Sequence, residues 1–303
     1  MKRDLLTIRD LSAEDIVHLV SRAAEMKRDL AGGALQPSLA GKILGLLFVK
    51  PSTRTRVSFE AAMIHLGGRC IFMTAQDSQI SRQEPLSDTG RVLSRYIDGL
   101  VVRTHAHSDV EELARFASIP VINGLTDLSH PCQVLSDLLT IQEQFGNMEK
   151  VTVAWIGDGN NMAHSWINAA ARIGFTLYLA CPPGYPPNRN VLERARSERD
   201  GKIFLVENPL DAVSSADVLY TDVWASMGYE NQTDTRRKAF APYQVNEDLL
   251  AAAPSHAIVL HCLPAHRGEE ITNSVIEGPQ SKVFEQAENR MHLQTALLDM
   301  LLR

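Results

Sequence analysis

The sequence has few cysteines and no long apolar run, and both absences narrow the class of protein. The four cysteines are far apart and form no C-x-x-C pair, which favours a reduced, cytoplasmic protein. No apolar run approaches the roughly 20 residues that are needed to span a bilayer. The first residues also lack the apolar core of a secretory signal. We therefore expect a cytoplasmic protein that does not interact with membranes.

The chain also lacks a net positive charge and the glycine-rich motif of a P-loop. The net charge of −6 argues against nucleic acid as the main partner, because binding to a phosphate backbone needs a basic face. The chain lacks the G-x-x-x-x-G-K pattern of a P-loop, so a nucleoside triphosphate is not implied. A length of 303 residues indicates one to two domains.

Apolar runs alternate with amphipathic segments along most of the chain. Strands are predicted at 43–49, 70–73, 99–103, 120–122, 151–156, 176–180, 202–206, 218–220 and 257–260. Near-continuous apolar strands separated by helices predict an α/β fold of two doubly wound domains, each with a central parallel sheet flanked by helices. We place the first domain at 1–146 and the second at 147–284. A final helix at about 285–303 is expected to pack back on the first domain.

The polar segment KPSTRTR, at residues 50–56, follows the first apolar run and precedes a predicted helix over 57–66. The start of a helix offers unpaired backbone N–H groups and partial positive charge. Arg54 and Arg56 add planar donor forks, and neutral hydrogen-bonding groups come from Ser52, Thr53 and Thr55. The segment predicts a site for an anion. The alternative is that Ser52 is only an N-cap and that the arginines are solvated.

Five more polar clusters follow predicted strands, and ligands of open parallel sheets bind at the carboxyl ends of strands. The clusters are Arg103, His130 with Gln133, Gly157–Asn161, and the two loops that begin at Asp222 and His261. An anionic ligand would pair with Arg103, although a structural carboxylate could do the same. His130 could donate a hydrogen bond to a carbonyl group or could cap a helix.

Three patterns have competing interpretations. Gly157-Asp158-Gly159 begins like a dinucleotide fingerprint, but the third glycine is missing, and the asparagines that follow could instead bind an amino acid's carboxylate. Cys262 could be a nucleophile, although a buried or ligand-contacting thiol is the better hypothesis. His105 and His107 have strand-like spacing for a metal, but no partner cluster completes the site.

Three segments together resemble the signature of the carbamoyltransferase family. They are Ser52-Thr53-Arg54-Thr55-Arg56, His130-Pro131-Cys132-Gln133 and His261-Cys262-Leu263-Pro264, in order over essentially the whole chain. Cys132, Cys262 and the loop Asp222-x-x-x-Ser226-Met227-Gly228 resemble the ornithine branch rather than the aspartate branch. The resemblance implies transfer of the carbamoyl group of carbamoyl phosphate to the δ-amine of L-ornithine, which yields L-citrulline and phosphate in arginine metabolism.

The resemblance also implies roles for individual residues. Those implied to bind carbamoyl phosphate are Ser52, Thr53, Arg54, Thr55, Gln79, Arg103, His130, Gln133, Cys262, Leu263 and Arg290. Those implied to act in catalysis are Arg103, His130, Cys262 and Arg290. Those implied to bind ornithine are Asn161, Asp222, Ser226 and Met227. The family uses no metal and no organic cofactor, and it forms trimers or multiples of trimers in which Gln79 would reach a neighbouring subunit's site.

Several alternatives remain open at the level of sequence. A sister transferase could act on putrescine, acetylornithine or aspartate. A catalytically silent regulator that binds anions or amino acids, and an NAD-dependent dehydrogenase, belong to other classes of protein. The biosynthetic or catabolic direction, the choice between trimer and dodecamer, and a purely structural ion pair for Arg56 are also open.

Overall fold

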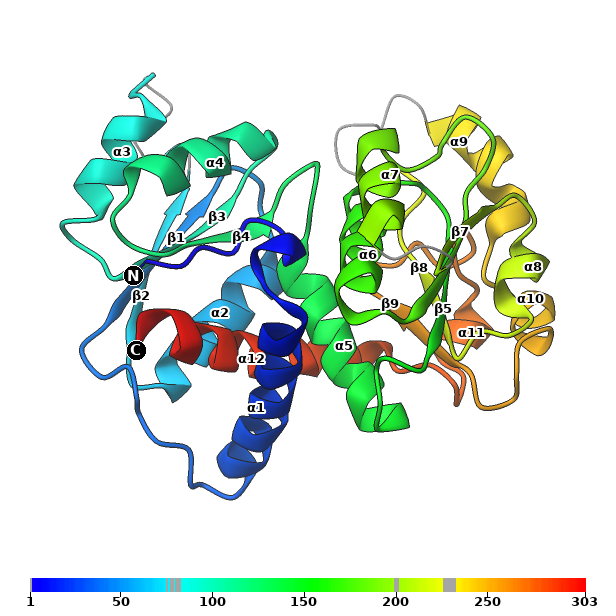
Figure 1. The fold of residues 1–303 in the computed structure, drawn as a ribbon, viewed down its shortest axis with the longest axis horizontal. Helices are drawn as coiled ribbons and strands as arrows, with labels where there is room; N and C mark the ends of the chain where they lie inside the picture. Colours follow the sequence, from blue (N-terminus) through cyan, green and yellow to red (C-terminus); the bar gives the residue numbers. More distant parts are fainter. Residues whose placement is uncertain (1, 75, 77–78, 80–82, 199–201, 226–232) are drawn as a thin grey trace. The chain divides into compact units, whose positions relative to one another are not determined.

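The computed structural model describes residues 2–74, 76, 79, 83–198, 202–225 and 233–303 (Figure 1). The chain forms two compact units. Unit 1 comprises Met1–Leu139 with Asn289–Arg303, and unit 2 comprises Thr140–Glu288. The sequence suggests a break after Gly146, whereas the units divide inside the helix that ends at Phe145. Within the described residues, no helix is both long and apolar enough to cross a membrane.

Unit 1 contains a four-stranded sheet in the order β2-β1-β3-β4, with every neighbouring pair parallel. Its strands are β1 (Ile43–Phe48), β2 (Arg69–Thr74), β3 (Gly99–Arg103) and β4 (Val121–Leu125). The inner strands β1 and β3 are almost entirely buried, as expected for a parallel sheet that is covered on both faces. β4 extends beyond its predicted end at residue 122 to Leu125, and its register with β3 shifts between Val102 and Arg103.

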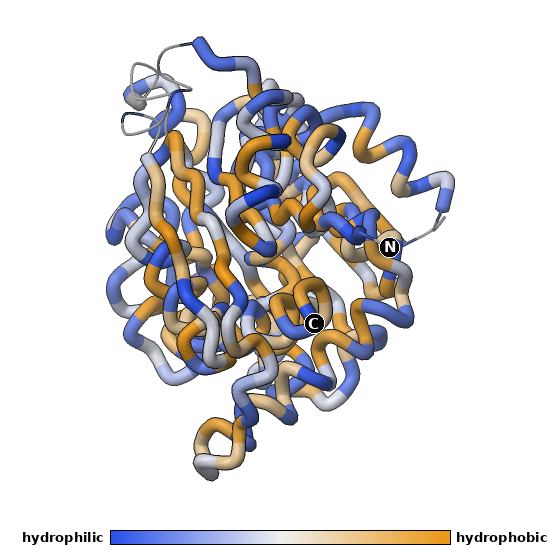
Figure 2. Tube along the Cα trace, turned by 90° about the vertical axis from the view of Figure 1, so that its left-hand side faces the viewer, coloured by the Kyte–Doolittle hydropathy of each residue, from blue (hydrophilic) through white to orange (hydrophobic). Residues whose placement is uncertain are grey.

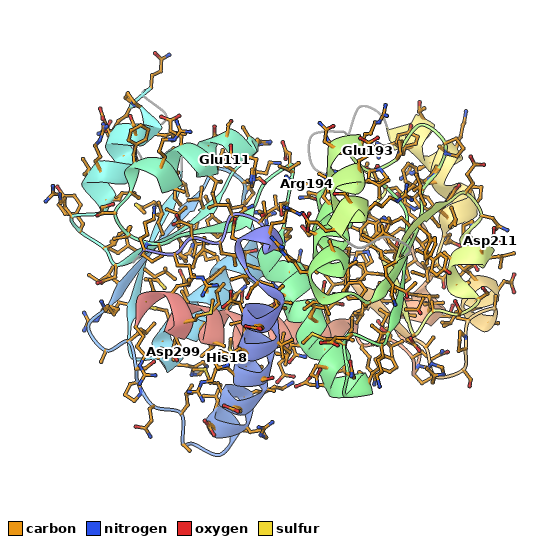
Figure 3. The ribbon with its side chains drawn as sticks, viewed as in Figure 1. His18, Glu111, Glu193, Arg194, Asp211 and Asp299 are labelled. Carbon is orange, nitrogen blue, oxygen red and sulfur yellow. The ribbon has the colours of Figure 1, made fainter. Side chains whose placement is uncertain are left out.

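The helices of unit 1 cover this sheet. They are α1 (Ala13–Ala31), α2 (Thr53–His65), α3 (Leu86–Leu93), α4 (His107–Phe116), the start of α5 (Pro131–Phe145) and the end of α12 (Val283–Leu302). Helix α1 begins with a capping box in which Ser12 and Asp15 each accept the other's backbone N–H. Hydrophilic and hydrophobic residues alternate along the helices (Figure 2). Asp299 of α12 accepts a hydrogen bond of 2.5 Å from Ser38 (Figure 3).

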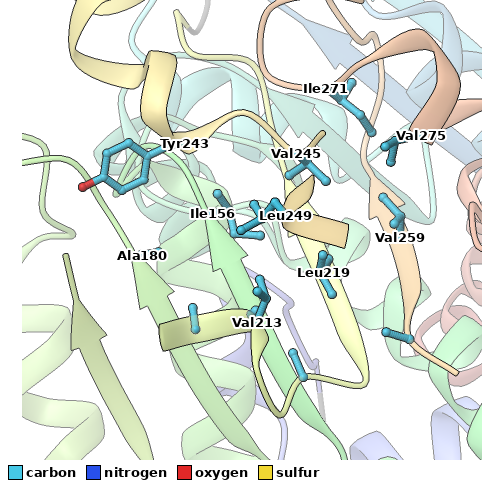
Figure 4. Packing of buried hydrophobic residues seen from close by; sticks show 14 of the residues in the cluster. Ile156, Ala180, Val213, Leu219, Tyr243, Val245, Leu249, Val259, Ile271 and Val275 are labelled. Atoms are coloured by element: carbon cyan, nitrogen blue, oxygen red, sulfur yellow. The ribbon is translucent and has the colours of Figure 1, made fainter. Parts of the chain in front are cut away.

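Unit 2 contains a five-stranded parallel sheet in the order β7-β6-β5-β8-β9. Its strands are β5 (Thr152–Ile156), β6 (Thr176–Ala180), β7 (Ile203–Val206), β8 (Val218–Thr221) and β9 (Ile258–His261). Its helices include α6 (Asn161–Ile173), α7 (Arg189–Glu198), α8 (Pro209–Val213), α9 (Thr233–Phe240), α10 (Glu247–Ala251) and α11 (Asn273–Ile276). Leu219 and Val259 of the sheet pack with Val213, Leu249 and Val275 of the short helices (Figure 4). The predicted fold class is therefore confirmed.

Each sheet has one point at which the order of its strands reverses. In unit 1, the chain runs from β1 outward to β2 and then returns to β3 on the other side of β1. In unit 2, the chain runs from β5 outward to β6 and β7 and then returns to β8. Loops separate at such a switch point, and ligands of doubly wound sheets bind there. Ligands are therefore expected at the carboxyl ends of β1 and β3 in unit 1, and at those of β5 and β8 in unit 2.

Candidate active site

Helix α2 begins at Thr53, directly after β1, with Ser52 as its N-cap. The Ser52 hydroxyl accepts the Thr55 N–H at 3.3 Å. The helix therefore starts four residues before the predicted start at residue 57, and residues 53–56 form its first turn. Because the N–H groups of a first turn lack partners within the helix, they point toward whatever lies beyond the strand end. Ser52 does cap the helix, as the alternative supposed, and a cap is compatible with an anion site at the same helix start.

Arg54 and Arg56 lie in the same turn but have different surroundings. Arg56 is exposed, and its Nε lies 3.0 Å from Oε1 of Glu60, one turn further along the helix. Its guanidinium also covers the ring of Phe72 at 3.8 Å from the ring centroid. Arg54 is half-buried, and no carboxylate in the described part of the chain forms an ion pair with it. Arg56 thus has the structural ion pair that the sequence left open, while Arg54 is placed to meet an anion.

A buried polar cluster lies in unit 1 and includes Thr55, Arg103, His130, Gln133 and Arg290, each at most 8% exposed. Arg290 of α12 donates to the Thr55 hydroxyl at 2.8 Å and to Oε1 of Gln133 at 2.5 Å. The Ser52 hydroxyl donates to the Thr55 hydroxyl at 3.0 Å. Arg103 ends β3 beside Phe48, the last residue of β1. The structure therefore brings together six residues that come from four separate segments of the sequence. They are Ser52 and Thr55, Arg103, His130 and Gln133, and Arg290.

His130 is the titratable group most strongly affected by this cluster. Burial holds the pKa of His130 well below its usual value of 6.5, and the positive charges of Arg290, Arg103 and Arg54 lower it further. A neutral imidazole carries one N–H and can still donate one hydrogen bond. The electrostatic effect of three arginines on one ring also means that their charges act on the same small region. An anion bound in that region would experience all three charges.

In unit 2, three strand ends meet at the carboxylate of Asp222, which is 8% exposed. Asn160, after β5, donates its side-chain amide to Oδ2 at 2.9 Å. Cys262, after β9, donates its thiol to Oδ1 at 3.0 Å, and the N–H of Val223 donates to the same oxygen at 2.8 Å. The Cys262 thiol is thus a hydrogen-bond donor to a carboxylate.

Asn160 belongs to the Gly157–Asn161 cluster, but the sequence analysis assigned a substrate contact only to Asn161. Its Oδ1 caps α6 by accepting the N–H groups of Met162 and Ala163 at 2.9 and 3.2 Å. The same side chain orients Asp222 through its Nδ2. Asn161 is the first residue of α6 and is half-buried. The available signal was the capping preference of asparagine directly before a helix.

A buried ion pair between Asp158 and Arg236 is a second feature that the sequence did not reveal. Arg236 of α9 donates to Oδ2 of Asp158 at 2.8 Å and to the carbonyl of Trp224 at 2.7 Å. Burial raises the pKa of Asp158, and the charge of Arg236 opposes that rise. Ser226 and Met227, which were expected to bind ornithine, lie outside the described residues.

Gly159 is explained by a contact with the chain itself. A Cβ atom at this position would lie 2.1 Å from the backbone nitrogen of Pro187 and 2.3 Å from the carbonyl carbon of Pro186. The N–H of Gly159 also donates to the carbonyl of Tyr185 at 3.0 Å. The second glycine of a dinucleotide fingerprint allows the pyrophosphate to approach the backbone, whereas here the proline-rich loop 182–187 takes that space. This geometry argues against a dinucleotide at this strand end.

Two further residues that the sequence analysis named are Leu263 and Gln79. Leu263 has a left-handed backbone with φ of 56°, and its N–H donates to Nδ1 of His261 at 2.8 Å. Gln79 is exposed, and its carbonyl accepts the N–H of Glu84 at 3.2 Å. Nothing in the described part of unit 1 connects Gln79 with the buried cluster around His130.

Two groups of side chains bear on metal binding: the pair His105 and His107, which the sequence pointed to, and a separate cluster in unit 2. His107 bonds through Nδ1 to the hydroxyl of Thr126 at 2.9 Å, and burial lowers its pKa. A separate group with suitable spacing is His266, Glu269 and Glu270, whose ligand atoms lie within 4.8 Å of one another. Glu269 already pairs with Arg237, and Glu270 accepts the N–H of His266 at 2.5 Å and faces Nε2 of His261 at 3.2 Å. Internal bonds therefore already engage Glu269 and one oxygen of Glu270, whereas Oε2 of Glu270 is buried without a hydrogen-bond partner among the described residues.

Comparison with known proteins gives matches over nearly the full chain. Residues 3–143 match the carbamoyl-P binding domain of aspartate/ornithine carbamoyltransferases, and residues 149–301 match their Asp/Orn binding domain. An ornithine carbamoyltransferase of Desulfotalea psychrophila is 53% identical over 299 residues and covers 99% of both chains. One of Syntrophus aciditrophicus is 51% identical, with 100% of both chains covered.

Solved structures give the same result. An ornithine carbamoyltransferase from Pyrococcus furiosus superposes with a TM-score of 0.96 at 48% identity and covers 99% of this chain and 97% of that one. The enzyme of the same name from Thermus thermophilus superposes with a TM-score of 0.91 at 40% identity, with 100% of both chains covered.

Proposed function

The chain belongs to the aspartate/ornithine carbamoyltransferase family, and from that premise we propose that it transfers the carbamoyl group of carbamoyl phosphate to the δ-amine of L-ornithine. The products are L-citrulline and phosphate. The observation that carries the proposal is the buried cluster of unit 1, where Arg54, Arg103 and Arg290 all act on the neutral ring of His130. Several fixed cations and an uncharged donor suit a small dianion that carries a carbonyl group.

Carbamoyl phosphate would be held by the start of α2. Ser52, Thr53 and Thr55 would supply hydroxyl and backbone donors to the phosphate, while Arg54 and Arg103 would supply charge. Each arginine at contact distance contributes about 4 kcal/mol of attraction at an effective dielectric constant near 20, before the desolvation cost is subtracted. Gln133 would contact the carbamoyl amide. We assign carbamoyl phosphate to domain 1–146, with the C-terminal helix, and ornithine to domain 147–284.

The chemical step places negative charge on the carbonyl oxygen as the amine attacks the carbonyl carbon. Donors that point at this oxygen favour the transition state over the ground state. His130, Thr55 and Arg290 would provide them. The Thr55 hydroxyl accepts from both Arg290 and Ser52, which directs its own hydrogen to a third acceptor. The new C–N bond replaces the C–O bond to phosphate, the amine loses a proton, and the phosphate leaves from the site that already holds it.

Ornithine would be bound by unit 2. The α-ammonium group would pair with Asp222, whose carboxylate Asn160 and Cys262 hold in place. Asn161, together with Ser226 and Met227 from the segment outside the described residues, would contact the amino-acid end. Cys262 and Leu263 would approach the side chain. A carboxylate at this position favours a substrate with a free ammonium group at this end, which supports ornithine over acetylornithine.

The chain would work as a cytoplasmic homotrimer, or a multiple of trimers, without metal or organic cofactor. Large apolar side chains on the outer face of α2 and on the edge strand β2 support the assembly. Val57, Ile64 and Ile71 are 55, 66 and 46% exposed, and a second copy of the chain would cover them. Gln79 would then reach a neighbouring subunit's site. All four cysteines are described and none forms a disulfide, which supports a reducing compartment.

One experiment tests the reaction and its acceptor. The protein is incubated with carbamoyl phosphate and, in separate reactions, with ornithine, acetylornithine, putrescine or aspartate, and the ureido product is measured. We expect citrulline from ornithine and little product from the other three. Absence of citrulline would contradict the proposal, and faster turnover of another amine would replace ornithine with that acceptor.

A further inference from the structure

The turn that precedes His130 is built from buried hydrogen bonds. The N–H of Thr126 donates to the carbonyl of Ser129 at 2.9 Å, and the N–H of Ser129 donates back to the Thr126 hydroxyl at 3.3 Å. Both residues are at most 1% exposed. Because Ser129 directly precedes His130, the position of its carbonyl fixes where the His130 backbone begins. The turn therefore sets the location of a ring that the reaction needs within a fraction of an ångström.

Asn123 of β4 joins this turn to another part of the chain. Its side-chain amide nitrogen donates to the carbonyl of Ser129 at 3.3 Å and to the carbonyl of Leu6 at 2.8 Å. Asn123 is fully buried, and its backbone carbonyl accepts a hydrogen bond from the Cys132 thiol at 3.5 Å. Burial raises the pKa of that thiol to about 12, so Cys132 keeps its hydrogen for this bond. Asn123 thus contacts the residues on both sides of His130.

The N-terminal segment reaches Asn123 along the open edge of β4. Leu5 forms a parallel bridge with Ile122 and exchanges two backbone bonds with β4, to the carbonyl of Val121 at 3.0 Å and from the N–H of Asn123 at 2.8 Å. Asp4 accepts the N–H of Val121 at 2.7 Å, and Leu5 is fully buried. These bonds place the Leu6 carbonyl where the Asn123 amide needs it. A segment more than 115 residues away in sequence therefore takes part in shaping the turn.

We propose that Asn123 is a positioning residue for His130, and that residues 4–6 act through it. The inference rests on the proposed function, in which His130 donates to the carbonyl oxygen. Loss of the amide would leave the half-buried Leu6 and the buried Ser129 without this donor to their carbonyls, and the turn would relax. A displacement of about 1 Å at a reacting group can cost about a hundredfold in rate.

A double-mutant cycle separates positioning from a general effect on folding. Asn123→Ala is made in the wild-type chain and in a His130→Ala chain, and kcat is measured at saturating substrates. We expect kcat to fall about tenfold or more in the wild-type background and less than about twofold in the His130→Ala background. An equal fold-change in the two backgrounds, or no change in either, would overturn the proposal. The inhibition constant of inorganic phosphate should stay the same, since Ser52 and Arg54 do not touch Asn123.

A second pair of variants tests the turn if Asn123→Ala does not fold. Thr126→Val removes the hydroxyl that accepts the Ser129 N–H, while Thr126→Ser keeps it. We expect Thr126→Val to lower kcat and Thr126→Ser to retain it; equal values for the two would overturn the proposal. Ser136→Ala is the control, because it removes a buried hydroxyl of helix α5 that donates to the carbonyl of Cys132 at 2.7 Å, and it should leave kcat unchanged.

The two proposals fail in different ways. A wild-type chain that makes no ureido product would reject the proposed function and the positioning role together. A fully active wild-type chain with unaffected Asn123→Ala and Thr126→Val variants would reject the positioning role alone.

Discussion

The two arginines of the first turn of α2 give a matched pair of substitutions. Arg54→Ala removes a half-buried cation that has no carboxylate partner among the described residues, and Arg56→Ala removes an exposed one that pairs with Glu60. An attraction of about 4 kcal/mol at an effective dielectric constant near 20 is reduced by the cost of desolvating the arginine. About 3 kcal/mol would remain in the transition state, which corresponds to about a hundredfold in kcat/KM for carbamoyl phosphate.

Arg56→Ala should behave differently, because its charge is already compensated. An exposed i,i+4 ion pair contributes about 0.3–0.5 kcal/mol to the free energy of unfolding, and the stacking of Arg56 on Phe72 adds about 0.5–1 kcal/mol. We therefore expect a small decrease in melting temperature and kcat/KM within about twofold of the wild type. Arg54→Ala should show the reverse, a large loss of kcat/KM with little change in melting temperature.

Steady-state kinetics and thermal unfolding of the two variants suffice for the test. Equal losses of kcat/KM in both would show that the motif acts through general positive charge rather than through Arg54. A near-normal Arg54→Ala enzyme would remove this residue from the phosphate site.

Three further predictions follow from the same cluster and its counterpart in unit 2. The value of kcat/KM for ornithine should rise from pH 6 to 8, because a δ-amine with a lysine-like pKa of about 10.4 must lose its proton before attack; a flat profile would contradict this requirement. The ring of His130, followed by NMR, should stay neutral well below pH 6.5 in the ligand-free protein. Since the unfolded state then binds more protons than the folded state, His130 should make the free energy of unfolding decrease as the pH falls below 6.5, and His130→Gln should weaken that dependence. Asn160→Ala should raise KM for ornithine and cost about 1 kcal/mol of stability through the lost cap, while KM for carbamoyl phosphate should not change; an unaltered KM for ornithine would separate Asn160 from the role of Asp222.

The parts of the fold that the sequence predicted are those set by local pattern. Continuous apolar runs identified the strands because a parallel strand is buried on both faces, and the ends of β3 and β6 were predicted at the observed residues. The start of α2 was placed too late because a run of threonines and arginines has no apolar period. Ser52 carried the missing information as a cap, since one hydroxyl decides where the helix begins.

The contacts that complete the candidate site could not be predicted in the same way. Arg290 bonds Thr55 across 235 residues, and Arg236 bonds Asp158 across 78 residues. No local periodicity links such pairs, because only the three-dimensional arrangement of strand ends brings them together. Resemblance supplied Arg290, since its surroundings match a known motif. Asn123 and Arg236 belong to no motif that we identified, and their bonds became visible only in the structure.

The contact between Gly159 and the prolines of loop 182–187 limits which ligands unit 2 could be redesigned to bind. A strand, a glycine-rich turn and a helix are the elements that form a nucleotide-binding pocket, yet the chain's own backbone fills the space over this turn. Residue 159 should therefore tolerate no side chain in a mutational scan, because even a methyl group would displace two prolines. Anyone redesigning this domain to accept a nucleotide would have to shorten the loop before changing a single residue of the turn.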